Sequence, residues 1–141
     1  MNDTYQLQRF VDAQRTVYAR ALQELRNGHK QSHWIWFIFP QMQGLGRSEM
    51  AERFGISGAG EAQAYLMHPV LGPRLEECVN ALLTHDDRSA LDILGSPDDI
   101  KLRSSMTLFA NIACEHPLFK TVLDRFFDGE EDEKTLFLLG D

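Results

Sequence analysis

Residues 5–26 repeat apolar side chains every three or four positions, and this pattern limits the possible folds more than any other feature of the chain. A period of 3.6 residues places these side chains on one face of an α-helix, which must be buried against another element. Asp3 or Thr4 can cap the start of this helix, and Gly28 can end it. The apolar positions are Leu7, Phe10, Val11, Val17, Tyr18, Ala21, Leu22 and Leu25.

Helical signals continue through the rest of the chain. Capping residues precede apolar runs, and prolines stand where a first helical turn tolerates them. No alternating run of apolar and polar residues and no hairpin dipeptide interrupts the pattern. We therefore predict an all-α fold, one compact domain of about seven or eight helices, several of them short, over residues 1–141. After the first helix we predict a short helical turn between Ser32 and Pro40. The further helices cover residues 48–54, 57–67, 69–84, 89–94, 97–113, 117–127 and 132–139.

Composition excludes several classes of function. The net charge of −7 repels a phosphate backbone, so we expect no nucleic-acid partner. No apolar run reaches the roughly 18 residues of a membrane helix, and no secretory leader is visible, so we expect a cytoplasmic protein with no membrane partner. Cys78 and Cys114 fall in predicted helices without a CxxC spacing. We expect both to be reduced core thiols, with no disulfide, metal or other cofactor.

Three polar residues stand where the helical period places apolar ones. Gln14 fills a gap in the first predicted helix, and it either fastens a loop or lines a polar pocket, since an unpaired buried amide costs about 1–3 kcal/mol. Lys101 and Ser105 lie one turn apart on the apolar face of a later helix. Lys101 either pairs with an acid such as Asp98 or Asp12, or binds an anion with Ser105 as a hydrogen-bonding neighbour.

Both tryptophans of the chain fall within residues 32–41, together with two phenylalanines and a histidine. Such a stretch is substantially buried, and it can supply the centre of the core. In a helical turn His33, Trp36 and Phe37 would form a flat wall with a titratable nitrogen beside it, which suits a planar ligand. His33 can equally be an ordinary structural histidine.

A glycine-containing loop at residues 44–48 carries Arg47 and leads into a helix that Ser48 can cap. A flexible backbone beside a helix start and a guanidinium can hold an anion. A simple turn followed by an N-cap explains the same residues. The loop matches neither a Walker A sequence nor a dinucleotide fingerprint.

Five long motifs run through the chain. They are Lys30-x-Ser32-His33-Trp34-x-Trp36-Phe37-Ile38-Phe39-Pro40-Gln41, Gly44-Leu45-Gly46-x-Ser48, Ala64-Tyr65-Leu66-x-His68-Pro69-x-Leu71-Gly72-x-Arg74-Leu75, Asp98-Asp99-x-Lys101-Leu102-x-Ser104-Ser105-Met106-Thr107-Leu108-Phe109 and Asp132-x-x-Thr135-Leu136. With these motifs the sequence resembles, over essentially its whole length, a bacterial family known as domain of unknown function 1810. The resemblance implies a small, mostly helical fold but no particular activity or catalytic residue. The name calpastatin sometimes attached to such proteins has no mechanistic basis here.

Our leading hypothesis is a cleft between the aromatic segment and the Lys101 helix that binds a small anionic, nucleotide-like metabolite. In such a cleft an indole stacks on the ligand, cations meet its negative charge, and polar groups orient it. His33 is the best candidate for acid–base catalysis. The predicted ligand-binding residues are Gln14, Lys30, His33, Trp34, Trp36, Arg47, Lys101 and Ser105.

Two alternatives use the same residues differently. In the first, the protein is an interaction or structural module without a ligand, whose partner the sequence does not identify. In the second, it is a hydrolase or transferase acting on a nucleotide-derived substrate through His33 and the acids Asp98 and Asp99, which helix capping also explains. Internal partners for both Lys101 and Gln14, with no concave pocket separating them from Trp36, would favour the first alternative. A shared pocket with unpaired donors would favour a ligand.

Overall fold

The computed structural model describes residues 3–140, and in this range it contains ten α-helices and no strand. The predicted all-α fold is confirmed. None of these helices has the length and apolarity that crossing a membrane requires. In chain order they are α1 (Gln8–Arg15), α2 (Tyr18–Asn27), α3 (Ile35–Ile38), α4 (Glu49–Arg53), α5 (Ala59–Met67), α6 (Leu71–Leu83), α7 (Ala90–Leu94), α8 (Asp98–Ile112), α9 (Leu118–Phe127) and α10 (Glu133–Leu139).

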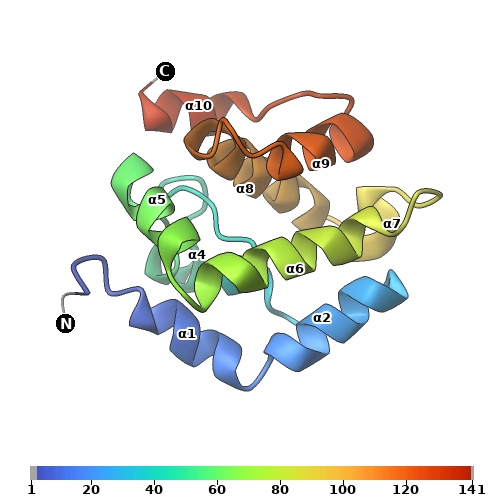
Figure 1. The fold of residues 1–141 in the computed structure, drawn as a ribbon, viewed down its shortest axis with the longest axis horizontal. Helices are drawn as coiled ribbons and strands as arrows, with labels where there is room; N and C mark the ends of the chain where they lie inside the picture. Colours follow the sequence, from blue (N-terminus) through green and yellow to red (C-terminus); the bar gives the residue numbers. More distant parts are fainter. Residues whose placement is uncertain (1–2, 141) are drawn as a thin grey trace.

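Helix α6 runs through the middle of the domain, with α1 and α2 on one side and α8, α9 and α10 on the other (Figure 1). It packs against α2, α5 and α9, while α8 packs against α5, α7, α9 and α10. The short α3 lies against α1 and α8, so the aromatic segment is central, as predicted. One continuous core results. Its largest fully buried side chains include Phe10, Trp34, Phe39, Tyr65, Phe109 and Phe119.

The single helix predicted over residues 5–26 is wrong, because two helices, α1 and α2, meet at Thr16 and Val17. Val17 has a φ of −120°, which lies outside the helical region. Two consecutive β-branched residues also lower the local helix propensity. The chain changes direction at this point (Figure 1), so α1 packs on α3 while α2 packs on α6. The two halves therefore bury their apolar stripes against different elements.

Several predicted helix ends are confirmed. Gly28 ends α2 in the left-handed conformation with a φ of 74°. The Ser48 hydroxyl caps α4, as predicted. The Asp132 carboxylate caps α10 at the start of the helix predicted over residues 132–139. Helix α8, however, begins one residue later than predicted, directly after Pro97 and without a side-chain cap. Its start therefore relies on proline geometry and the two acids of its first turn.

The two cysteines have different environments. Cys78 lies on α6 with 1% of its surface exposed, as predicted, and burial raises the pKa of its thiol to about 12. The prediction of a buried core thiol is wrong for Cys114, which is exposed. Helix α8 ends at Ile112, because the chain then turns towards Pro117 ahead of α9. The turn carries Cys114 to the surface, where its Sγ donates to the Asn111 carbonyl at 3.1 Å.

The loop between α3 and α4 is fixed from two sides. The Ile56 amide donates to the Gln41 carbonyl at 2.9 Å, and the Gln43 amide donates to the Ile56 carbonyl at 2.8 Å. On the other side the Leu138 side chain of α10 lies near Gly44, 3.7 Å from the position that a Cβ of this residue would take. The loop that carries Arg47 is therefore held between the core and the C-terminal helix.

Candidate functional site

A pocket of about 420 Å³ lies between the loop that follows α3, the first turns of α8 and the segment that begins α10. Its walls combine apolar side chains with three cations, and they come from parts of the chain that are distant in sequence. The lining residues are Trp36, Gln41, Leu45, Gly46, Arg47, Ser48, Ala51, Pro97, Ile100, Lys101, Ser104, Asp132 and Lys134.

Lys101 is held at the pocket wall by two partners. Its Nζ lies 5.1 Å from the centroid of the Trp36 ring and 3.6 Å from Asp98 Oδ1. Asp98 has a closer partner in Lys30, whose Nζ lies 2.8 Å from Oδ2 and 5.0 Å from the Trp34 ring centroid. One carboxylate thus faces two ammonium groups, and it can neutralise only one of them. Since Lys30 is the nearer, Lys101 keeps positive charge at the pocket wall.

Arg47 and Lys134 add two further cations. Both are exposed, and within the part of the chain that the structure describes neither has an ion-pair or hydrogen-bond partner. The one carboxylate in the lining, Asp132, is already engaged, because it accepts from the Thr135 amide at 3.0 Å and faces Arg103 Nη2 at 3.9 Å. Three cations and one carboxylate give the lining a net charge of +2.

The pocket also offers an apolar wall and a free amide. Trp36 is partly exposed, and Leu45 and the 53% exposed Ile100 lie beside it. The Gln41 side chain lines the same space and makes no hydrogen bond within residues 3–140. The arrangement can therefore stack a flat group, bind negative charge and provide a hydrogen-bonding amide.

Three of the eight predicted ligand-binding residues, Trp36, Arg47 and Lys101, line this pocket, and the other five do not. Lys30 stands behind the wall in its pair with Asp98. His33 is exposed and precedes α3, so the predicted wall with Trp36 does not form. The five residues outside the lining are Gln14, Lys30, His33, Trp34 and Ser105.

Gln14 and Ser105 point into the packed interior. Gln14 is 1% exposed, and its Nε2 donates to the Phe37 carbonyl at 2.7 Å and to the Tyr65 hydroxyl at 3.2 Å. Its amide therefore fastens α1 to the aromatic segment. Ser105 is fully buried, and its hydroxyl has no hydrogen-bond partner within the described residues.

Trp34 is anchored by an acid that sequence reasoning missed. Glu24 is 7% exposed, and its carboxylate accepts from Trp34 Nε1 at 2.9 Å, from the Gln31 amide at 2.9 Å, and from the Ser32 amide and hydroxyl at 3.1 and 2.8 Å. Burial alone would raise the pKa of this carboxyl, but the four hydrogen bonds outweigh it and lower the pKa to about 2. The position of Glu24 on the apolar face of α2 is a signal that could have revealed it.

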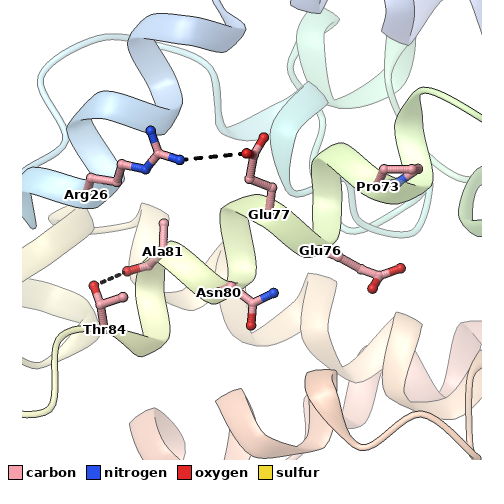
Figure 2. A pocket seen from close by; sticks show the side chains of 7 residues that line it. All are labelled: Arg26, Pro73, Glu76, Glu77, Asn80, Ala81 and Thr84. Atoms are coloured by element: carbon pink, nitrogen blue, oxygen red, sulfur yellow. Dashed lines mark hydrogen bonds and ion pairs between the residues drawn. The ribbon is translucent and has the colours of Figure 1, made fainter.

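A second depression, of about 620 Å³, lies between α2 and α6. Figure 2 shows Arg26 reaching from α2 towards Glu77 on α6, where the two side chains approach to 3.7 Å. Glu77 also accepts from the Tyr18 hydroxyl, and Glu76 lies 3.3 Å from His116 Nε2. Each charged group of this depression thus already has a partner in the protein, and we do not take it as the site. The lining residues are Arg26, Pro73, Glu76, Glu77, Asn80, Ala81 and Thr84.

Fold and site together define a small all-α protein with a cation-lined pocket beside its buried aromatic segment. Residues 4–139 match the family described as "Protein of unknown function (DUF1810)", and the chain belongs to this family, which confirms the resemblance of its motifs. The chain is similar to the crystal structure of the conserved hypothetical protein Rv1873 from Mycobacterium tuberculosis, with 49% identity, a TM-score of 0.96 and 99% of each chain covered. No curated protein matches it significantly.

Proposed function

We propose that the protein binds a small organic anion in the pocket between the aromatic segment, α8 and α10. The observation that carries this proposal is the convergence of Arg47, Lys101 and Lys134 on one concave surface, with no acid paired to Arg47 or Lys134 within residues 3–140. Cations that line the same pocket repel each other, and an anionic ligand relieves that repulsion.

The shape of the pocket supports a ligand with a flat, partly apolar body. A volume of about 420 Å³ falls within the range of small-molecule sites, roughly 300–1,000 Å³. The partly exposed Trp36 indole can stack on a planar group, and the Gln41 amide can hydrogen-bond to its edge. These properties suit a nucleotide-like metabolite, and the cytoplasmic location that we predict would give access to one.

A purely structural role accounts for only part of the polar residues. Gln14 and Glu24 find all their partners inside the protein and need no ligand. Arg47 and Lys134 do not stabilise the fold through any ion pair among the described residues. Ligand binding gives a reason for their position, and for this reason we prefer it to an interaction module.

Isothermal titration calorimetry tests the proposal with adenosine 5′-monophosphate and phenyl phosphate as probes and adenosine as the uncharged comparison. We expect both anions to bind, and the variants Arg47→Gln, Lys101→Gln and Lys134→Gln each to weaken binding roughly tenfold, because each removes one charge-assisted contact. Lys120→Gln is the matched control, since this lysine pairs with Asp124 on α9, away from the pocket. Absence of binding at millimolar concentration, or equal affinities in all four variants, would overturn the proposal.

Tryptophan fluorescence locates the bound probe. Trp36 is partly exposed in the pocket whereas Trp34 is fully buried, so a stacked probe should change the emission of Trp36 only. A fluorescence change in wild type that disappears in Trp36→Phe supports stacking at this ring. A change that persists in Trp36→Phe places the probe elsewhere.

A further inference from the structure

The charge balance of this pocket narrows the class of ligand. Arg47, Lys101 and Lys134 stand against the single carboxylate of Asp132, which leaves a net charge of +2. We propose that the bound group is a dianion of the phosphate monoester class, and not a monoanion such as a carboxylate or a sulfate ester. This inference rests on the proposed function and refines it. A phosphate monoester carries about −1.5 to −2 charges at neutral pH, which matches the lining.

Charged groups behind the wall leave this balance unchanged. Lys30 and Asp98 neutralise each other at 2.8 Å, with side chains only 7% and 17% exposed. Arg103 faces Glu130 and Asp132, each at 3.9 Å. Asp132 already belongs to the lining, so the positive charge of Arg103 cancels the negative charge of Glu130. The lining together with these four groups therefore keeps a net charge of +2, and Glu131 and Glu133 lie outside the lining, in the neighbouring depression. Among the described residues that line the pocket there is no histidine.

An acidic surface borders the pocket on the side of α10 and shares Asp132 and Lys134 with it. Four carboxylates line this neighbouring depression and only two cations, Arg103 and Lys134. A diphosphate or triphosphate extending across it would meet like charges. The negative charge of the ligand is therefore confined to one terminal group. The acids are Glu130, Glu131, Asp132 and Glu133.

The donor chemistry of the pocket also fits a phosphate monoester. Such a group presents three terminal oxygens, and the pocket supplies three cationic side chains from three separate segments. The Arg47 guanidinium can donate two parallel hydrogen bonds, while the two lysine ammonium groups act as point charges. A planar carboxylate has only two oxygens and would leave one cation without a contact.

Phenyl phosphate and phenyl sulfate provide the test, since both combine a ring with a tetrahedral anionic group but differ by one charge. At about pH 8, calorimetric titration should show phenyl phosphate binding roughly tenfold more tightly, because the phosphate is then a dianion. At about pH 5 phenyl phosphate is mainly a monoanion, so its advantage should fall towards parity. Because no histidine lines the pocket, the change reports the ligand and not a histidine of the site.

A variant separates this inference from the proposed function. Lys134→Gln lowers the lining charge to +1, so it should reduce the preference for phosphate over sulfate, while Lys120→Gln should preserve it. Equal binding of the two esters at about pH 8, with both weakened by Arg47→Gln, would overturn the dianion inference and leave the anion pocket standing. Failure of both esters to bind at millimolar concentration would overturn both proposals.

Discussion

The substitution Glu24→Gln removes the charge that positions the aromatic segment beside the pocket. In the folded protein the pKa of this carboxyl falls from 4.5 to about 2, because hydrogen bonds from Gln31, Ser32 and Trp34 outweigh the effect of burial. Each tenfold change in proton affinity corresponds to about 1.4 kcal/mol, so folding favours the ionised form by about 3 kcal/mol. Glutamine resembles the neutral carboxyl in shape. We therefore expect Glu24→Gln to lower the free energy of unfolding by roughly 3 kcal/mol at neutral pH.

The pH dependence of this loss distinguishes charge from shape. Because the pKa is depressed by folding, the stabilisation is complete above the unfolded value of 4.5 and disappears as the pH falls towards about 2. Urea unfolding should give a constant difference between wild type and variant from about pH 7 to about pH 5, and a smaller one at about pH 3. Glu115→Gln, at an exposed position, should change stability by less than about 0.5 kcal/mol throughout. A difference that stays constant in acid would refute the reasoning.

Three further predictions concern close packing, thiol exposure and a buried ion pair. In Gly72→Ala the new Cβ would lie 2.1 Å from a backbone oxygen of α5. Thermal unfolding should therefore show that the free energy of unfolding falls by about 3 kcal/mol. An unchanged stability would contradict the close approach of α5 and α6. Maleimide should label the exposed Cys114 of the folded protein and leave the buried Cys78 unlabelled, which mass spectrometry measures. Equal labelling of the two thiols would contradict the burial of Cys78. Lys30→Met leaves Asp98 without its nearest partner, so urea unfolding should show that the free energy of unfolding falls by about 3 kcal/mol. Lys30→Arg keeps a positive charge beside Asp98 and should lower it much less.

Helix positions could be predicted because their determinants are local. A glycine in the left-handed conformation at residue 28 and a serine cap at residue 48 act through neighbouring backbone groups, so the sequence alone reveals them. The break between α1 and α2 is different. Apolar positions continue on both sides of Thr16 and Val17, and these two β-branched residues only weaken the helix. The turn also depends on the separate surfaces of α3 and α6, against which the two helices pack. The break between α1 and α2 therefore depends on tertiary packing, and the apolar periodicity alone does not predict it.

Some lining residues of the pocket could likewise be predicted from local sequence, whereas others depend on tertiary packing. Each of three lining residues has a local signal in the sequence: Trp36 lies in an aromatic run, Arg47 in a glycine-containing loop before a helix, and Lys101 on an apolar helix face. Lys134 is an ordinary exposed lysine on a short helix, and it lines the pocket only because of how α10 docks on α8. That docking includes a hydrogen bond from the Asp132 amide to Thr107 Oγ1 at 2.9 Å, which joins residues far apart in the chain. No pattern within either segment predicts it.

Gln14 and Glu24 differ from Lys101 in their access to water, although all three are polar side chains on apolar helix faces. Gln14 and Glu24 are nearly fully buried, where an unsatisfied donor or acceptor is costly, and both are held by several internal hydrogen bonds. Lys101 is 26% exposed and can tolerate an incomplete ion pair, because water solvates the remaining charge. Such a group can exchange its water for a ligand, whereas a saturated buried group cannot. A polar residue on an apolar helix face can therefore have a buried structural role or a ligand-binding role. Its exposure and its hydrogen-bond partners distinguish the two roles.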